Sequence, residues 1–560
     1  MSQPRDNLPP RSSSQFQAHL VARNTLKWEE QKLRADADFK KNLSPTARQA
    51  CEISDRIRDE EMRTVWTPDV EETMATTKHG AVFPGMMFMQ AKERMEGTKL
   101  WRIVRRMPKG CLLHCHIDAM ADFEHLIDEL LKLPGMHLSA NMPLVTAEAR
   151  EDAKVVFRYR NEGDADGKAI WTPEYKARNF VLLSDAADSF PNGGQAGFVS
   201  WLLSRCMLST MDSHEQHHGI NAIWEKFEKC FSVVGTMTHY EPMLRCLLRR
   251  LMRVLKDDGI NWVELRYGWP LNYCRDRQEE PEKDYTHFFQ VVEEEVKLFQ
   301  DSKEGRGFWG VTFIWSSRRS METQKLLEHM QHCITTKKRF PHLIAGFDLV
   351  GHEDQGRSLD SLLPELLWFT EECKKERIQL PFFFHAGETL GDGDEVDDNL
   401  FDAILLGTRR IGHGYSLYKH PKLINMVKDR RILIESCPIS NEVLRLCGSI
   451  MAHPLPALIA QGVCCSLSND GPAILGQKST GVSHDFWQAL QGWKNLGLAG
   501  LGNLAENSVR WAAFEDEEDT AWWQGLGGIG SGTRARDNWL QEWREEWEGF
   551  CAWVIEEYGN

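Results

Sequence analysis

Two short segments of the sequence carry side chains suited to hydrolytic chemistry. Phe384-His385-Ala386-Gly387-Glu388 places an imidazole and a carboxylate at the end of one apolar run, and Gly412-His413-Gly414 ends the next apolar run with a second imidazole. Imidazoles bind divalent metal ions, and a positioned carboxyl group can transfer protons. Residues 380–384 have the pattern of a buried strand that ends at a glycine turn. His385 and Glu388 are therefore predicted at the mouth of a strand.

A second pair of imidazoles occurs much earlier in the chain. After Met107-Pro108-Lys109-Gly110, the residues from Leu112 to His116 have the composition of a strand. Residues i and i+2 of a strand face the same side, so His114 and His116 point together while Cys115 points away. One face of this strand thus offers two metal ligands, unless the two histidines are unrelated core residues.

These candidates must be positioned by a larger framework of alternating strands and helices. Eight apolar runs of strand length are separated mostly by helix-length segments, and they cover residues 112–116, 262–267, 311–315, 343–350, 381–385, 410–413, 432–436 and 463–467. Eight β/α units predict an α/β protein with the TIM (β/α)8 barrel architecture, in which chemistry gathers at the C-terminal ends of the strands.

The barrel prediction brings the candidate residues together at one end. Strands one, five, six and eight would end, respectively, at His114 and His116, at His385 and Glu388, at His413, and at Asp470. Three neutral imidazoles with one carboxylate suit a borderline divalent ion such as zinc. A bound ion of this kind can lower the pKa of a water to about 7. Each histidine alone could be a core residue, but four at strand ends favour a metal site.

Composition and charge narrow the class of partner. The 560-residue chain has a net charge of −15, which argues against binding a nucleic-acid backbone and favours a small ligand. Its 14 cysteines form no C-x-x-C pair, as expected for reduced thiols in the cytoplasm. The polar N-terminus contains no apolar segment of signal-peptide length, and no run is long enough to span a bilayer. A cytoplasmic protein without membrane contact is predicted.

Regions outside the barrel are predicted to be mostly helical. The sequence divides into a disordered tail at 1–15, a helical region at 16–106, a barrel domain at 107–515 and a helical extension at 516–560. The stretch at about 134–220 breaks the β/α rhythm and is interpreted as an insertion after the first strand. The charged N-terminal helices form either a solvated collar or an arm for homodimerisation.

Six segments form one series along the chain. They are Met107-Pro108-Lys109-Gly110 with His114-Cys115-His116, residues 346–354, His385-Ala386-Gly387-Glu388-Thr389, residues 410–415, Cys437-Pro438-Ile439-Ser440-Asn441 and Ser468-Asn469-Asp470-Gly471-Pro472. Taken in order, these segments resemble the motifs of the adenosine deaminase superfamily, over roughly residues 85–515. The long N-terminal region, the insertion and the Met-Pro-Lys-Gly segment most resemble the adenosine deaminase-related growth factor branch.

The resemblance implies an activity and a role for each matching residue. It implies zinc-dependent hydrolytic deamination of adenosine, or of a related 6-aminopurine nucleoside, to the 6-oxopurine and ammonia. The family pattern assigns zinc binding to His114, His116, His385 and Asp470. It further implies that Glu388 protonates the purine N1 while hydroxide attacks C6, that His413 orients the hydroxide, and that Asp470 accepts its proton. Asp118 and Gly351 would contact the ribose and the purine N3.

Two residues depart from the family pattern. Gly471 stands where the family has a second aspartate, which hydrogen-bonds the purine N7, and Ala119 replaces a common glycine. Loss of a buried hydrogen-bond partner costs about 1–3 kcal/mol and could admit another ring. Two alternatives therefore stay open. One is a non-catalytic nucleoside-binding or signalling protein on a deaminase scaffold, and the other is a related metal hydrolase acting on a different ring.

Overall fold

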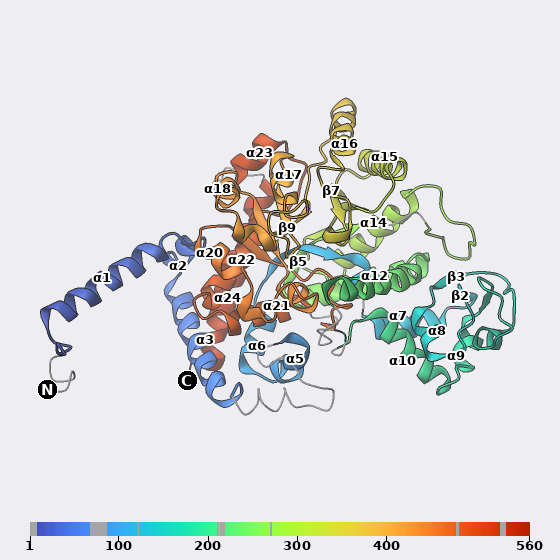
Figure 1. Ribbon diagram of the computed structural model, residues 1–560, viewed down its shortest axis with the longest axis horizontal. Helices are drawn as coiled ribbons and strands as arrows, with labels where there is room; N and C mark the ends of the chain where they lie inside the picture. The colour runs from blue at the N-terminus through green and yellow to red at the C-terminus, as the bar shows by residue number, and fades with distance from the viewer. Residues whose placement is uncertain are drawn as a thin grey trace.

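The centre of the molecule is a barrel of eight parallel strands, made of two four-stranded sheets that are joined at both edges. Figure 1 labels β5, β7 and β9 of this barrel. The structure is a computed structural model that describes residues 8–67, 87–120, 122–209, 212, 219–268, 272–477, 481–526 and 534–559, so the first seven residues of the predicted tail lie outside the described residues. The barrel strands are β1 (Gly110–His116), β5 (Ile260–Tyr267), β6 (Gly310–Arg318), β7 (Ile344–Val350), β8 (His385–Ala386), β9 (Arg410–His413), β10 (Leu433–Ser436) and β11 (Cys465–Leu467).

Backbone hydrogen bonds close these strands into a ring. The strands form two parallel sheets with the orders β1-β5-β6-β7 and β11-β10-β9-β8. At one seam Phe347 donates to Pro381 O and receives a bond from Phe383 N–H, both at 2.9 Å. At the other seam His116 N–H donates to Asp470 O at 2.9 Å and Asp470 N–H donates to His114 O at 3.1 Å. The prediction of a TIM barrel is confirmed, and Asp470 is joined directly to the strand that carries the two early histidines.

The fifth strand is shorter than its apolar run predicts. Only His385 and Ala386 form a regular ladder, pairing with Gly412 and His413 of β9. Residues 381–384 make a single bridge, between Phe347 and Phe382. Pro381 has no N–H and therefore contributes only its carbonyl oxygen, which accepts from Phe347 N–H.

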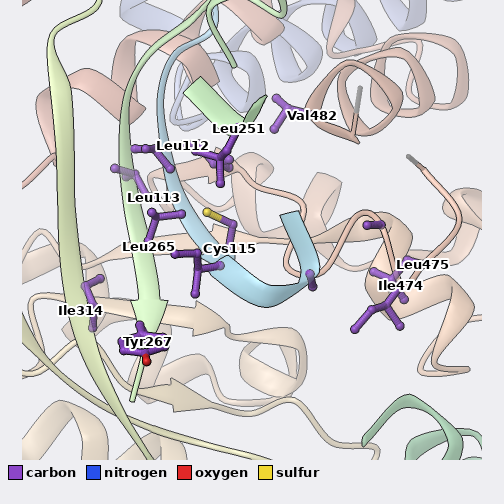
Figure 2. Packing of buried hydrophobic residues seen from close by; sticks show 14 of the residues in the cluster. Leu112, Leu113, Cys115, Leu251, Leu265, Tyr267, Ile314, Ile474, Leu475 and Val482 are labelled. Atoms are coloured by element: carbon purple, nitrogen blue, oxygen red, sulfur yellow. The ribbon is translucent and has the colours of Figure 1, made fainter. Parts of the chain in front are cut away.

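Helices cover the outside of the barrel, and apolar side chains fill the space between. Figure 2 shows Leu113, Cys115 and Leu265 in one buried cluster with Leu251 of the helix before β5. Cys115 thus points outward, as strand alternation predicts. The helices that follow or connect the strands are α7 (Phe123–Lys132), α12 (Gly219–Thr238), α13 (Glu241–Asp257), α14 (Thr286–Gln300), α15 (Thr323–Arg339), α16 (Leu363–Glu376), α17 (Asn399–Leu405), α18 (Pro421–Asp429), α19 (Pro438–Val443), α20 (Leu455–Ala460), α21 (Gly481–Gly492) and α22 (Gly497–Arg510).

The region after β1 contains a small antiparallel sheet that the sequence analysis did not anticipate. Its strands follow the order β3-β2-β4, with α8–α10 around them. In Figure 1 this unit lies at the right, below α12. The elements are β2 (Met136–Ala140), α8 (Ala147–Asp152), β3 (Val155–Tyr159), β4 (Phe180–Leu182), α9 (Leu183–Asp188) and α10 (Gly194–Cys206).

Helices from both ends of the chain pack on the same side of the barrel. Figure 1 shows α3 beside α24, and the two helices are in contact. In contrast, α1 projects away from the body of the molecule and buries none of its residues. These helices are α1 (Ser14–Gln31), α2 (Ala37–Lys41), α3 (Pro45–Thr64), α5 (Phe88–Glu96), α6 (Lys99–Arg106), α23 (Asp519–Gly525) and α24 (Arg534–Tyr558).

Candidate active site

Four predicted ligands meet at the carboxyl-terminal mouth of the barrel. One ligand atom from each of His114, His116, His385 and Asp470 lies within 4.8 Å of every other. His114 and His116 come from β1, His385 begins β8, and Asp470 follows β11. Asp470 Oδ1 is 3.1 Å from His116 Nε2 and 3.7 Å from His114 Nε2. Three imidazoles and a carboxylate thus converge from segments more than 350 residues apart in the chain.

Buried carboxylates orient two of these imidazoles. His114 Nδ1 lies 2.9 Å from Glu435 Oε2, and His385 Nδ1 lies 2.7 Å from Asp348 Oδ2. A carboxylate accepts a hydrogen bond from Nδ1–H, which leaves Nε2 unprotonated, with its lone pair directed into the cluster. Burial lowers the pKa of His114 well below its usual value, so this ring is neutral. Both features suit metal ligation, which requires an unprotonated nitrogen.

Arg266 of β5 joins the two orienting carboxylates. Its guanidinium donates to Asp348 at 2.8 Å and to Glu435 at 2.7 Å, and all three side chains are fully buried. These three residues were not predicted from the sequence. Each is a charged residue within a barrel strand, and that was the available signal, because a charge is buried in a strand only when it is paired.

Removing Arg266 should destabilise the protein strongly. The Arg266→Met variant leaves Asp348 and Glu435 buried without their shared cation, so we expect a loss of about 3–5 kcal/mol in the free energy of unfolding. Arg253→Met is the matched control, because Arg253 bonds Glu304 at a similar 2.9 Å with its side chain 48% exposed. That exposed pair should be worth about 1 kcal/mol or less. Urea denaturation measures both, and equal losses would contradict a structural role for Arg266.

Glu388 and His413 lie beside the cluster. Glu388 Oε1 is 3.2 Å from His413 Nδ1, and both side chains are buried. Burial, reinforced by the negative charges of Asp470 and Glu353, raises the pKa of Glu388 well above its usual value. Burial also lowers the pKa of His413 to about 3. The protonated form of this carboxyl group is therefore favoured, and the group lies next to a neutral imidazole.

The backbone is unusual at two of these positions. His413 has φ of 62° and Asp470 has φ of 58°, both in the left-handed region that residues with a side chain seldom adopt. Such conformations cost of order 1–3 kcal/mol and persist where the surrounding structure imposes them. Gly412 is required for a different reason, because a β-carbon there would lie 2.7 Å from His114 Cε1. The absence of a side chain at Gly412 thus lets the imidazole of His114 lie close to the strand that carries His413.

A pocket leads from the surface to the cluster. It encloses about 680 Å³ of atom-free space, including its open mouth. Helix α12 supplies one wall with Trp224, Phe227, Glu228 and Phe231. These positions follow the i, i+3, i+4, i+7 spacing of one helical face. From the sequence this spacing predicted a helix, but not that its face lines a pocket. The antiparallel unit supports this helix, since Phe157 N–H donates to Thr236 Oγ1 at 3.3 Å.

The two predicted substrate contacts have different surroundings. Gly351 lines the pocket, with φ of 107°, and faces α12 so closely that a β-carbon there would be 3.8 Å from Glu228 Oε1. Asp118 is buried beneath α12, where its Oδ1 accepts a bond from Thr238 Oγ1 at 2.9 Å. The structure brings Gly351 to the cavity that leads to the cluster, whereas Asp118 is in contact with the helix that forms its wall.

Several buried polar atoms in the site are compatible with a metal ion or substrate as partner. Among the described residues, His114 Nε2, His413 Nε2 and Glu388 Oε1 have no hydrogen-bond partner. Leaving such atoms unsatisfied costs about 1–3 kcal/mol each, so native proteins seldom bury them without a role. The donor set around His114 is that of a zinc site, and the residues present therefore fit this ion.

A closed (β/α)8 barrel with four imidazoles and two carboxyl groups at its carboxyl-terminal mouth is typical of hydrolases that use a bound metal ion. The sequence model of the adenosine deaminase family matches residues 205–526, which is more than half of the chain. The chain belongs to the adenosine deaminase family. The predicted superfamily, growth factor branch and enzyme class, a hydrolase acting on cyclic amidines, are thereby confirmed.

Relatives match along most of their length. Adenosine deaminase 2 of Homo sapiens is 29% identical over 502 residues, covering 89% of this chain and 88% of the relative. Adenosine deaminase of Phlebotomus duboscqi is 30% identical over 485 residues, covering 86% and 84%. Among solved structures, an amidohydrolase of Burkhoderia ambifaria with bound Zn superposes with a TM-score of 0.50 at 13% identity, covering 81% of this chain and 94% of that one. This last similarity concerns the fold alone.

Proposed function

We propose that this protein is a zinc-dependent deaminase that converts adenosine or a related 6-aminopurine nucleoside to the 6-oxopurine and ammonia. The observation that carries the proposal is the meeting of His114, His116, His385 and Asp470 beside a buried Glu388 whose pKa is raised. Family membership and the names of the relatives support the same reaction. Both the ligand set and the proton donor are needed for hydrolysis of an aromatic amidine.

The metal-binding role is assigned to the four clustered side chains. His114, His116 and His385 would each offer a neutral nitrogen, and Asp470 would offer a carboxylate oxygen. When bound, a zinc ion polarises water and lowers its pKa toward neutrality. Glu435 and Asp348 would hold His114 and His385 in the required orientation.

Protons are moved by the residues beside the cluster. We propose that Glu388 gives its proton to N1 of the purine ring, which makes C6 electrophilic. Asp470 takes a proton from the attacking water, and His413 orients that water and stabilises the charge that develops on its oxygen. Asp470 then passes its proton to the 6-amino group, the C6–N bond breaks and ammonia leaves, while the remaining hydroxyl proton returns to Glu388 as the C6 carbonyl forms. General acid–base steps of this kind typically contribute 10²–10⁴-fold each.

The wall of the pocket is suited to a flat ring. Phe227 and Phe231 present aromatic surface on α12, and Trp224 stacks on His352 at 4.7 Å between ring centroids. Aromatic side chains of this kind would cover the purine and exclude bulk water from the reacting carbon. Glu228 stands near Gly351 at the same wall and could accept a hydrogen bond from a ribose hydroxyl.

A direct assay tests the proposal. Purified protein, fully loaded with zinc, should release ammonia from at least one 6-aminopurine nucleoside and shift its ultraviolet absorbance. Product mass identifies the 6-oxopurine. Absence of turnover across a panel of adenosine, its deoxy and N6-methyl analogues and their phosphates would exclude the proposed reaction.

The two departures from the family pattern lie in contact with one another. A β-carbon on Gly471 would lie 3.1 Å from the β-carbon of Ala119 and 3.6 Å from the Phe227 ring. Separations of 3.0–3.4 Å are tighter than normal packing, so the methyl group of Ala119 occupies the space that a side chain at 471 needs. The pocket beside the metal cluster is therefore apolar where the family pattern has a carboxylate. This feature favours, as a second candidate, a ring other than unmodified adenine.

A paired substitution should reveal how Gly471 affects substrate choice. We expect Gly471→Asp alone to be strained against Ala119, and Ala119→Gly/Gly471→Asp to accommodate the new carboxylate. If that carboxylate bonds the purine N7, as the family resemblance implies, the double variant should exceed the single variant in kcat/KM for adenosine by about fivefold or more, because a buried hydrogen bond contributes about 1–3 kcal/mol. Ala119→Gly alone is the control. Equal values for the single and double variants would contradict this coupling.

The non-catalytic alternative has less support from the site. A scaffold kept only for binding has no need of a proton donor, yet Glu388 is retained, buried and adjacent to His413. Nucleoside binding without turnover by the zinc-loaded protein would favour this alternative.

Compartment and assembly are further proposals. All 14 cysteines are unpaired and most are buried, which supports a reducing compartment such as the cytoplasm. Within the described parts of the chain, none of the helices combines the length and apolar character needed to cross a bilayer. Helix α1 buries no residue and exposes Val21, Leu26 and Trp28, which supports the proposed homodimer through the N-terminal helices.

A further inference from the structure

A line of hydrogen bonds leads from a helix terminus to His413. Leu455 N–H, at the start of α20, donates to Nδ1 of His453 at 3.1 Å. His453 Nε2 lies 3.0 Å from Asn441 Oδ1, and Asn441 Nδ2 lies 3.3 Å from His413 Nδ1. The line therefore passes through one backbone amide and three side chains that belong to separate segments around the site.

The chemistry of the first member fixes the direction of every bond in this line. A backbone N–H can only donate, so Nδ1 of His453 must accept. In a neutral imidazole the other nitrogen then carries the proton, and His453 Nε2 donates to Asn441. Asn441 must receive that bond with its carbonyl oxygen, which turns its NH₂ group toward His413. The opposite direction would place an N–H of His453 against Leu455 N–H, two donors facing each other at 3.1 Å.

The surroundings keep the line intact. Asn441 is completely buried, and His453 is 6% exposed. The His453 ring lies between Tyr415 and Trp493, with centroid distances of 5.5 and 5.8 Å. Burial lowers the pKa of His453 to about 3, so this ring is neutral at physiological pH. The side-chain amide of Asn441 is held in this orientation, because rotation by 180° would break its hydrogen bonds to both His453 and His413.

We propose that Asn441 and His453 are positioning residues that hold His413 in the tautomer with its proton on Nε2. This inference rests on the proposed function, in which His413 acts on the attacking water. An N–H at Nε2, which has no partner among the described residues, would donate to the oxygen of that water. Glu388 Oε1 lies 3.2 Å from Nδ1 but makes no hydrogen bond with it, so the Nδ1 lone pair is left to the N–H of Asn441.

The Asn441→Asp variant tests the direction of the line. Aspartate has nearly the same shape and can still accept from His453, but it cannot donate to His413. We expect His413 to move its proton to Nδ1, and kcat to fall by about 10²-fold or more with KM within about threefold. A wrongly held imidazole tautomer can cost about 10⁴-fold in kcat. Retention of kcat within about threefold in a folded, metal-loaded variant would overturn the proposal.

A second pair of variants acts one step further from the site. Glutamine at position 453 can keep the donor to Asn441, whereas leucine cannot. We expect His453→Leu to lower kcat by about tenfold or more and His453→Gln to recover most of that loss. A simple packing role would predict the reverse order, because leucine fills an apolar cavity at least as well. Comparison of His453→Leu with His453→Gln therefore tests the positioning role even if Asn441→Asp fails to fold.

The tautomer can also be measured without catalysis. Long-range ¹H–¹⁵N correlation spectra of histidine-labelled, metal-free protein distinguish Nδ1–H from Nε2–H, and His413→Gln identifies the His413 signal by its loss. We expect Nε2–H in the wild type and Nδ1–H in Asn441→Asp. A wild-type Nδ1–H signal overturns the inference whatever the activity is. An Nε2–H signal in a protein that deaminates no purine would instead uphold the line and reject the proposed function.

Discussion

Replacing Glu388 by glutamine should lower kcat by at least about 10²-fold while bound metal stays at the wild-type level. The amide has the shape of the carboxyl group but cannot give a proton to the ring, and general acid catalysis typically contributes 10²–10⁴-fold. Metal is retained because the predicted ligands are His114, His116, His385 and Asp470 rather than Glu388. Steady-state kinetics and metal analysis of the same preparation measure the two quantities.

The dependence of activity on pH should also reveal the proton on Glu388. Burial and the negative charges of Asp470 and Glu353 raise the pKa of Glu388, so its proton is lost only as the pH rises through that raised pKa. Activity that depends on this proton therefore declines on the alkaline side, and Glu388→Gln should lack that decline. Glu395→Gln is the control, because Glu395 is exposed in the loop that follows the site. Wild-type turnover by Glu388→Gln would remove Glu388 from the mechanism.

Removing the metal ion should lower kcat by at least about 10³-fold. Without an ion to lower its pKa, water at the site is a poor nucleophile at neutral pH. Dialysis against a chelator should therefore inactivate the protein, and zinc should restore it. In His385→Ala one of the converging ligand atoms is missing, so we expect weak metal binding and little restoration.

Two further variants test whether the loss of activity on metal removal comes from the four clustered ligands. His342→Ala removes an exposed histidine that pairs with Glu293 outside the cluster, and this variant should regain activity as the wild type does. Asp348→Asn keeps all four ligands but weakens the hold on His385, and loss of such a supporting bond typically costs 10–100-fold in metal affinity or activity. Full turnover by the chelated wild-type protein would exclude a metal-dependent reaction.

The supporting residues explain why the site is precise although its ligands come from distant segments. Arg266 bridges the carboxylates that orient His114 and His385, so displacement of one imidazole disturbs the other. Asn441 Nδ2 lies 3.3 Å from Nδ1 of His413, and we propose that it positions this third imidazole. Three of the imidazoles at the site, those of His114, His385 and His413, thus have an Nδ1 atom within hydrogen-bond distance of a buried side chain.

The sequence by itself determined the barrel and its principal chemical groups. The eight apolar runs predicted the eight strands, because burial on both faces of a parallel barrel strand leaves a near-continuous apolar signature. His114, His116, His385, Glu388, His413 and Asp470 were identifiable because each stands at the end of such a run. Both signals are local, so they can be read without knowing which strands become neighbours.

Only the tertiary structure decided how those groups are held. Arg266 lies 82 residues before Asp348 and 169 before Glu435, and no local pattern indicates that these charges neutralise one another. The face of α12 that lines the pocket and the contact of Gly471 with Ala119 likewise arise from segments brought together by folding. Hydrogen-bond direction and close packing depend on distances of a few tenths of an ångström, which a linear order of residues does not specify.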